Sequence, residues 1–285
     1  MKTRVITSVV GVGILFVVMA LFSTPVFNVV IALICLLAIH EVFRAFQLEK
    51  TAYLYWGFIP YTVLVLFSDY RRVRLWLLPL SYIFVLYLVA CVIRHSKSID
   101  FAKLGGMVLY ACIILFCFYS FIYLKQILPQ ETYGYDAIYF IFLSLGFAWG
   151  GDTAAYFTGR AFGKHKLAPV VSPNKTVEGA IGGVAGSMLL GVIVTACYSL
   201  LHGELVGMPL HSISAGYYLL IVLLAGIGSV LGVVGDLFAS VIKRQCGIKD
   251  YGSIFPGHGG IMDRFDSVIF IAPLVAMVVT ALVHL

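Results

Sequence analysis

Residues 216–241 read GYYLLIVLLAGIGSVLGVVGDLFASV, and Lys243 and Arg244 follow them closely. This run is longer than the ~20 predominantly apolar residues that a helix needs to cross a bilayer. Asp236 is the single acid within it, and an ionised group at membrane depth is costly enough to indicate a functional role. The stretch therefore predicts a membrane-spanning helix that carries a polar group into the bilayer.

The rest of the chain has the same apolar character. Hydrophobic residues make up 61% of the 285 residues and charged residues 11%, and the mean hydropathy is +1.03. Soluble domains are about 45–50% apolar and about 25% charged, so the bilayer is the main solvent of this protein. The net charge of +6 fits the excess of Lys and Arg in cytoplasmic loops of inner-membrane proteins. Because the basic residues are scattered over short loops, nucleic acid is not an expected partner.

Nine apolar segments predict an all-α polytopic membrane protein with about nine transmembrane helices. The segments are residues 5–22, 24–40, 53–68, 75–93, 104–124, 137–158, 177–201, 216–241 and 267–284. With the N-terminus in the cytoplasm, most Lys and Arg residues fall inside, but Arg71, Arg72, Arg74 and Lys125 fall outside. If the short segment 53–68 does not cross, the N-terminus moves outside while the loops after the sixth and eighth segments stay cytoplasmic.

The polar residues are concentrated in the second half of the chain. We expect one integral membrane domain over residues 1–285, with apolar N-terminal helices in 1–135 and the functional motifs on C-terminal helices in 136–285. Small residues four apart, such as Gly182 and Gly186, predict close helix packing there. The polar site is expected to face the cytoplasm.

One helix face and the loop after it carry the densest group of polar side chains. On a helix, Asp236, Ser240, Lys243 and Arg244 share one face. A structural interpretation is also open, in which Asp236 pairs within the bundle and the basic residues reach the interface. The loop adds six charged or titratable residues, interleaved with glycines: Lys249, Asp250, His258, Asp263, Arg264 and Asp266, with Gly252, Gly257, Gly259 and Gly260.

This composition is typical of a phosphate and Mg²⁺ site. Glycines allow backbone N–H groups to approach phosphate oxygens, and Lys and Arg offset the phosphate charge. Mg²⁺ is usually held by one or two carboxylates together with substrate phosphates, which suits Asp236 and Asp263. His258 could be a phosphate ligand, a general acid or a turn residue. Zinc is not expected, because no Cys or second His lies at ligand spacing.

A second polar stretch covers residues 149–179. Asp152, Tyr156 and Arg160 share a helix face, which makes Asp152 a second intramembrane acid. Residues 172–178, SPNKTVE, are typical of a helix start capped by Ser or Asn, and Lys175 would add positive charge to a helix N-terminus that already suits anions. Elsewhere, Glu41 and Arg44 are expected to form a surface pair.

Residues 240–266, SVIKRQCGIKDYGSIFPGHGGIMDRFD, resemble the signature of the phosphatidate cytidylyltransferase family. The stretches DTAAY at 152–156, GR at 159–160 and SPNKTVEG at 172–179 are similar to other blocks of that family. The resemblance implies that CTP and phosphatidate give CDP-diacylglycerol and pyrophosphate at the cytoplasmic face of a bacterial inner membrane. It also implies a Mg²⁺-dependent paired-metal site on Asp236 and Asp263, with the identity of the second ion open.

The resemblance suggests in-line attack by a phosphatidate oxygen on the α-phosphorus of CTP. The residues expected to bind phosphates or metal, or to orient them, are Asp236, Asp263, Lys243, Arg244, Lys249, Asp250, His258, Arg264 and Asp266. Substrate contacts are further expected from Ser240, Lys175, Gly259, Gly260 and Asp152. Two alternatives stay open: a cation-coupled transporter built on the intramembrane acids, and an enzyme that uses a different lipid acid. A homodimer is compatible with the sequence but does not follow from it.

Overall fold

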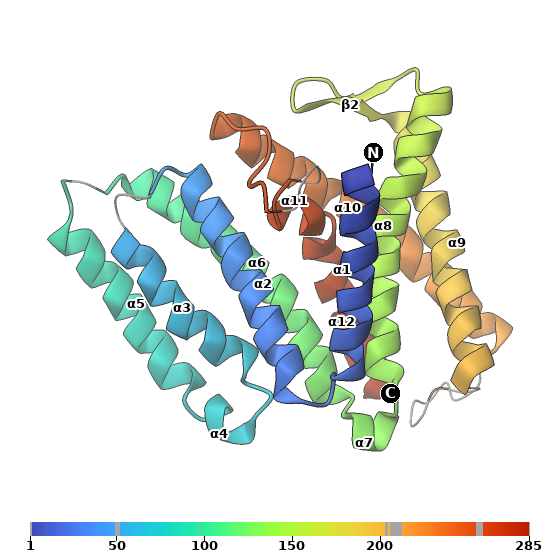
Figure 1. Ribbon diagram of the computed structural model, residues 1–285, viewed down its shortest axis with the longest axis horizontal. Coiled ribbons are helices and arrows are strands. Elements are labelled where there is room, and N and C mark those ends of the chain that lie inside the picture. Colours follow the sequence, from blue (N-terminus) through green and yellow to red (C-terminus); the bar gives the residue numbers. More distant parts are fainter. Residues whose placement is uncertain are drawn as a thin grey trace. The chain divides into compact units, whose positions relative to one another are not determined.

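The computed structural model describes residues 2–48, 52–97, 99–202, 205, 213–254 and 259–284. These residues form helices and one two-stranded sheet (Figure 1). The elements in chain order are α1 (Lys2–Ala20), α2 (Pro25–Ala45), α3 (Ala52–Leu66), α4 (Arg71–Arg74), α5 (Leu77–Arg94), α6 (Phe101–Ile127), α7 (Gln130–Tyr133), α8 (Asp136–Phe162), β1 (Lys166–Ala168), β2 (Ser172–Thr176), α9 (Val177–His202), α10 (Ala215–Gln245), α11 (Met262–Phe265) and α12 (Val268–Val283).

Each of the nine apolar segments predicted from the sequence lies on its own helix in the described part of the chain. Six helices are long and apolar enough to cross a membrane: α2, α5, α6, α8, α9 and α10. Three shorter apolar stretches, Val10–Ala20, Tyr53–Leu66 and Val268–Val283, complete the set. These features fit a multi-pass, predominantly helical membrane protein, and the number nine stays a prediction.

The chain folds into two compact units. Unit 1 comprises Met1–Ile122 and Gln245–Arg264, and unit 2 comprises Tyr123–Arg244 and Phe265–Leu285. The expected single membrane domain stays a prediction, but this packing differs from the expected halves 1–135 and 136–285. Part of the glycine-rich loop belongs with the N-terminal helices, because Glu41 of α2 binds its backbone directly.

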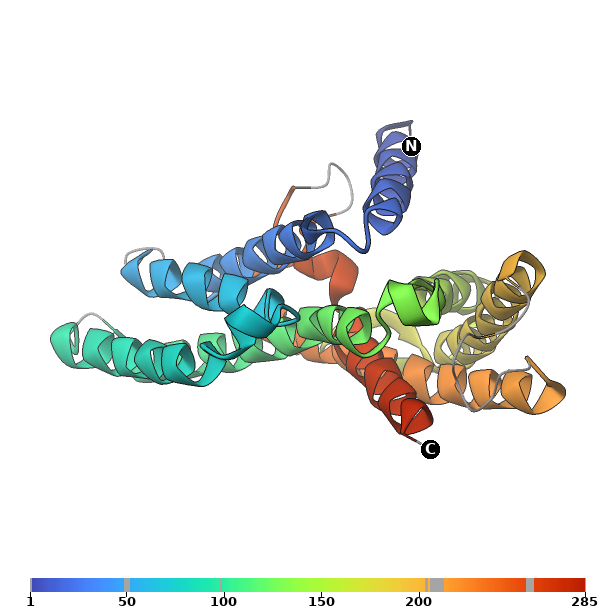
Figure 2. The ribbon, with the colours of Figure 1, turned by 90° about the horizontal axis from the view of Figure 1, so that it is seen from below.

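In unit 1, α3 runs antiparallel to α2 (Figures 1 and 2). At one end of α2, the Asn28 side chain donates to the Leu66 carbonyl at 2.7 Å. Towards the other end, the His40 and Tyr55 rings meet edge to face, with centroids 5.1 Å apart. These two contacts are about 18 Å apart along α2, at 1.5 Å per residue. The third segment therefore extends along most of α2, which is long and apolar enough to cross a membrane, and the arginines of α4 follow at the N-terminal end of α2.

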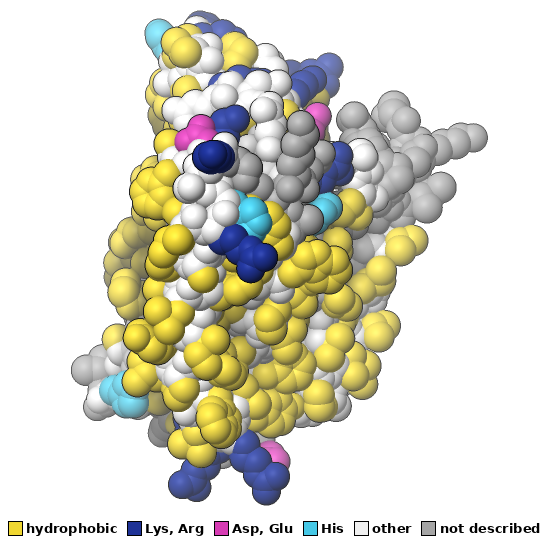
Figure 3. Space-filling view, turned by 90° about the vertical axis from the view of Figure 1, so that its left-hand side faces the viewer, with side chains coloured by type: hydrophobic (Ala, Val, Ile, Leu, Met, Phe, Trp, Pro, Cys, Tyr) yellow, Lys and Arg dark blue, Asp and Glu magenta, His cyan; other side chains and the backbone are white. Residues whose placement is uncertain are grey.

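Helix α5 of unit 1 exposes most of its apolar side chains. Helix α5 buries only Cys91, whereas Leu78 is 81% exposed and Ile93 is 72% exposed. Hydrophobic side chains form a broad band in Figure 3, with Lys and Arg side chains below it. Such a surface exceeds the apolar patches of soluble monomers and fits contact with lipid.

In unit 2, α8 and α9 pack side by side with very little space between their backbones (Figure 1). A Cβ at Gly183 would lie 3.1 Å from the Gly151 carbonyl oxygen, and one at Gly186 would overlap the Ala154 methyl group. The Ser187 hydroxyl donates to the Phe147 carbonyl of α8 at 2.7 Å. The predicted close packing of this glycine-rich helix is therefore confirmed.

The segment between α8 and α9 differs from the prediction. Strands β1 and β2 form an antiparallel hairpin in which Lys166 pairs with Thr176. Residues 172–176 are thus a strand rather than a helix start. Helix α9 begins at Val177, and its cap is Thr176, whose Oγ1 accepts the Gly179 N–H at 3.1 Å. Several residues in this stretch could cap a helix, and pairing with β1 decides between them.

Candidate active site

Two residues predicted for the site, Ser240 and Lys175, contact Asp236 in unit 2. The Ser240 hydroxyl donates to Asp236 Oδ1 at 3.3 Å, one turn along α10. Lys175 of β2 forms an ion pair with Asp236 Oδ2, and both side chains are 24% exposed. The hairpin therefore delivers the positive charge that compensates the acid inside the apolar helix.

The basic end of α10 is tied to two other segments of unit 2. Lys243 Nζ lies 3.9 Å from Asp266 Oδ2, and both side chains are only 11% exposed. Arg244 Nε donates to the Val171 carbonyl in the hairpin turn at 3.4 Å. Gly235 lies so close to the Asp266 carbonyl oxygen that a Cβ would overlap it. These contacts fix the residues just before α12 against the polar face of α10.

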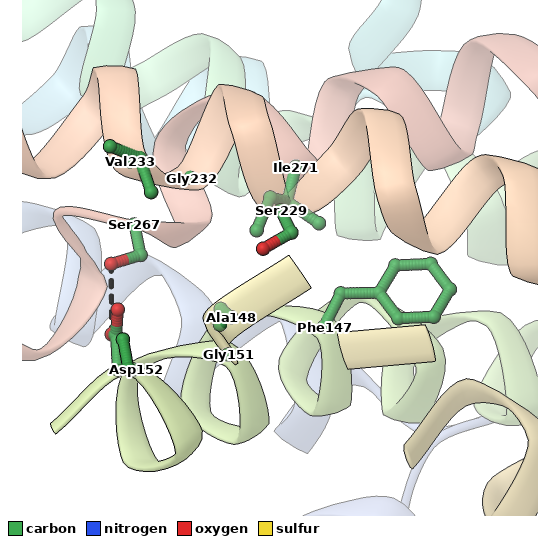
Figure 4. A pocket seen from close by; sticks show the side chains of 11 residues that line it. Phe147, Ala148, Gly151, Asp152, Ser229, Gly232, Val233, Ser267 and Ile271 are labelled. Carbon is green, nitrogen blue, oxygen red and sulfur yellow. Dashed lines mark hydrogen bonds between the residues drawn. The ribbon is translucent and has the colours of Figure 1, made fainter. Parts of the chain in front are cut away.

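Asp152, the second acid predicted to lie within a membrane-spanning segment, lies beside a small cavity between α8, α9, α10 and α12 (Figure 4). Its Oδ2 accepts a hydrogen bond from the Ser267 hydroxyl at 2.9 Å. The cavity of about 20 Å³ is large enough for one water molecule, and Asp152, Ser229 and Ser267 supply its polar side chains. Arg160, two turns further along α8, is exposed and donates to the Tyr156 hydroxyl at 3.4 Å.

Asp263 lies in unit 1 and is bound by the loop that precedes it. Its Oδ2 accepts the Tyr251 N–H at 2.8 Å and the Gly260 N–H at 3.0 Å. Gly259 has a φ of +81°, and a Cβ there would lie 2.9 Å from Asp263 Oδ2. The loop therefore needs glycine at this position both for its backbone conformation and for the approach of the carboxylate.

Glu41 is the site residue that the sequence interpretation missed. The expectation that Glu41 lies at the surface is wrong, since its exposed fraction is 3%. Its Oε1 accepts the Ile261 N–H at 3.0 Å, and its Oε2 accepts the Met262 N–H at 2.9 Å. An acid within the apolar run of α2 was the available signal, because such residues are rare and tend to be functional.

The N–H groups of residues 260, 261 and 262 thus all donate to carboxylates of the protein itself. A Cβ on Gly252 or Gly260 would overlap the Glu41 carboxylate. These two glycines make room for that side chain, which is a different use from the predicted one. Phosphate binding by Gly259 and Gly260 stays a prediction, and the N–H of Gly260 already has a partner.

The remaining predicted residues are at the surface or outside the description. Lys249, Asp250 and Arg264 are exposed. His258, with Pro256 and Gly257, lies outside the described residues. Within the described part of the chain, no three His, Cys, Asp or Glu residues form a cluster suited to a metal ion. Asp236 belongs to unit 2 and Asp263 to unit 1, so their pairing around metal stays a prediction.

The donor chemistry of the two aspartates nevertheless fits Mg²⁺. Each supplies carboxylate oxygens from a polar, partly shielded position, and Mg²⁺ takes its other ligands from water and substrate phosphates. Lys175 now compensates the charge of Asp236, a role that a divalent cation could share. In unit 2, the carboxylates of Asp236 and Asp266 lie beside Lys175 and Lys243, and Arg244 reaches the hairpin turn.

The sequence matches the cytidylyltransferase family over residues 2–282. A phosphatidate cytidylyltransferase of Bacillus subtilis (strain 168) is 33% identical over 279 residues, which cover 96% of this chain and 95% of the relative. Those of Staphylococcus haemolyticus (strain JCSC1435) and Staphylococcus aureus (strain COL) are 40% identical over 139 and 141 residues, which cover 49% of this chain and 48% of each relative. Since the family match extends over nearly the whole sequence, the chain belongs to the cytidylyltransferase family.

Proposed function

We propose that this protein transfers CMP from CTP to phosphatidate, giving CDP-diacylglycerol and pyrophosphate for phospholipid synthesis. The observation that carries the proposal is the full-length similarity to a phosphatidate cytidylyltransferase. The polar residues gathered on β2, α10 and the segment before α12 supply charges suited to a nucleotide in an otherwise apolar protein.

The reaction needs positioning and charge compensation more than covalent chemistry. A phosphatidate oxygen attacks the α-phosphorus of CTP, the bond to the bridging oxygen breaks, and pyrophosphate leaves with that electron pair. Lys175, Lys243 and Arg244 offset the phosphate charge from positions that Asp236, Asp266 and the Val171 carbonyl hold in place. No covalent intermediate between CMP and the enzyme is required.

Asp236 and Asp263 are the carboxylates that we propose to hold Mg²⁺, which supplies Lewis-acid stabilisation of the phosphates when bound. Asp263 is suited to this task because two backbone N–H groups fix its Oδ2. Lys249, Asp250, Arg264 and His258 complete the proposed substrate-binding loop. The number of ions and the identity of the second ion are separate questions.

We further propose nine membrane crossings in a bacterial inner membrane, with the polar site open to the cytoplasm. The apolar surface of α5 and the neighbouring helices then faces lipid. The phosphatidate headgroup reaches the site from the bilayer while its acyl chains remain among apolar side chains. The lipid-facing residues are generic, so an isoprenoid ether phosphate is the competing acceptor.

Pyrophosphate release by the purified protein tests the reaction. We expect release from CTP that depends on both phosphatidate and Mg²⁺, with little release from ATP, GTP or UTP. Release with an isoprenoid phosphate and none with phosphatidate would change the acceptor. Absence of release from a folded preparation with either lipid would refute the enzyme assignment and favour a transporter, which has no need to consume CTP.

A further inference from the structure

We infer that Glu41 of α2 is a positioning residue that holds the backbone beside Asp263 in its working conformation. The inference rests on the proposed function for the role of Asp263, but the contact itself does not. Glu41 lies in a helix without any recognisable motif, 220 residues before Ile261 in the sequence. Nothing in the signature of residues 240–266 points to it.

The geometry requires a carboxylate at this position. The two oxygens of Glu41 accept one N–H each, from adjacent residues, at 3.0 and 2.9 Å. Glutamine has the same shape but only one acceptor oxygen, and its NH₂ group would face the second N–H. Aspartate is shorter by one methylene group. Because Glu41 is 3% exposed, water cannot readily replace a lost bond.

The contact with Glu41 continues directly into Asp263. The N–H of Gly260 donates to Asp263, and the next two N–H groups donate to Glu41. Three consecutive N–H groups are thus held by two carboxylates, which together restrain the path of residues 260–262. Asp263 follows immediately, and its position depends on that path.

The residues around Glu41 leave just enough space for its carboxylate. Gly252 and Gly260 approach the carboxylate from two parts of the loop, and neither leaves room for a Cβ. Tyr251, next to Gly252, packs against Tyr110 of α6, and the centroids of the two rings are 5.9 Å apart. Glu41 therefore lies at the centre of the contact between the loop and the N-terminal helices of unit 1.

A loss of this contact should affect turnover more than substrate affinity. Displacement of a catalytic group by about 1 Å can reduce a rate on the order of 100-fold, even when binding is retained. For E41Q we expect kcat to fall at least tenfold, with KM for CTP changed less than threefold. A fall in kcat with little change in KM distinguishes this role from a direct contact with CTP, because the loss of such a contact would raise KM.

Asn28→Ala is the matched control for general destabilisation. Asn28 is also fully buried on α2, and its side chain donates to the Leu66 carbonyl and to Asp69, away from the loop. We expect this variant to lose thermal stability at least as much as E41Q while keeping kcat within threefold of wild type. If N28A and E41Q lose kcat in parallel with stability, Glu41 is structural only and the inference is overturned.

Hydrogen–deuterium exchange gives a readout that needs no activity. In the purified full-length protein, peptides covering residues 259–266 should exchange at least tenfold faster in E41Q than in wild type, and N28A should leave them unchanged. Unchanged exchange in E41Q would overturn the inference even if the enzyme proves to use another substrate. If E41Q cannot be recovered folded, Gly260→Ala is the second variant, because its added methyl group would displace the Glu41 carboxylate from the loop. We expect G260A to show the same faster exchange. Exchange as slow as in wild type would overturn the inference.

Discussion

The ion pair between Lys175 and Asp236 should stabilise the protein before any substrate binds. Replacement of Lys175 by Met removes the charge but keeps much of the side-chain volume. Asp236 would then keep its hydrogen bond from the Ser240 hydroxyl at 3.3 Å. It would lose its ion pair with Lys175 of the hairpin. The same contact is expected to hold β2 near α10.

The magnitude follows from the partial burial of the pair. Exposed ion pairs contribute about 0.2–1 kcal/mol, whereas removal of one partner from a buried pair costs about 3–5 kcal/mol. Both side chains here are 24% exposed, so we expect about 1–2 kcal/mol for K175M. A loss of 1 kcal/mol lowers the thermal unfolding midpoint of a domain of ~150–250 residues by about 2–4 °C, so we expect the midpoint of K175M to fall by about 2–8 °C.

A double-mutant cycle isolates the interaction. Thermal unfolding of wild type, K175M, D236N and the double variant would be compared in detergent micelles without CTP or Mg²⁺. We expect the double variant to be no less stable than K175M, since the uncompensated charge is gone. Strict additivity of the two single changes would mean that the pair does not form in solution, and the structural argument for the hairpin contact would fail.

Three further changes test separate parts of the structure. Gly186→Ala should separate α8 from α9 and cost about 1–3 kcal/mol of stability, whereas Gly105→Ala, with open space around it, should raise stability slightly; thermal unfolding distinguishes them. Tyr198→Phe should cost about 1.5–3 kcal/mol, because its hydroxyl donates to the buried Asp136; a change below 0.5 kcal/mol would contradict that bond. Asp263→Asn should abolish CTP turnover and leave folded protein in the membrane; wild-type turnover would remove its proposed metal role.

The sequence predicted the helices well because hydropathy and length decide them. Each apolar segment became a helix, including residues 53–68, whose short length made it the weakest of the nine. The shared face of α10 was also predictable, since helical periodicity alone places Ser240 beside Asp236. The local sequence pattern did not predict the hairpin. Ser172 and Asn174 are favourable helix caps, but residues 172–176 pair as a strand with β1, and Thr176 caps α9 instead.

Glu41 could not be assigned a partner from the sequence for a different reason. Its partners are backbone N–H groups, which every residue except proline has, so no side-chain pattern marks them. They also lie 220 and 221 residues further along the chain. The purpose of the glycines was equally ambiguous. A glycine that makes room for a carboxylate of the protein looks the same in the sequence as one that makes room for a phosphate.

The bonds from Glu41 also decide how much of the chain the loop at residues 260–262 needs for its hydrogen bonds. Every residue of the signature lies after residue 148, which would suggest that a C-terminal fragment holds the whole catalytic apparatus. A fragment that begins after α2 would contain all of those residues, yet Ile261 and Met262 would have lost the acceptor for their N–H groups. Helix α2 is therefore a structural part of the loop that carries Asp263, rather than a separable anchor.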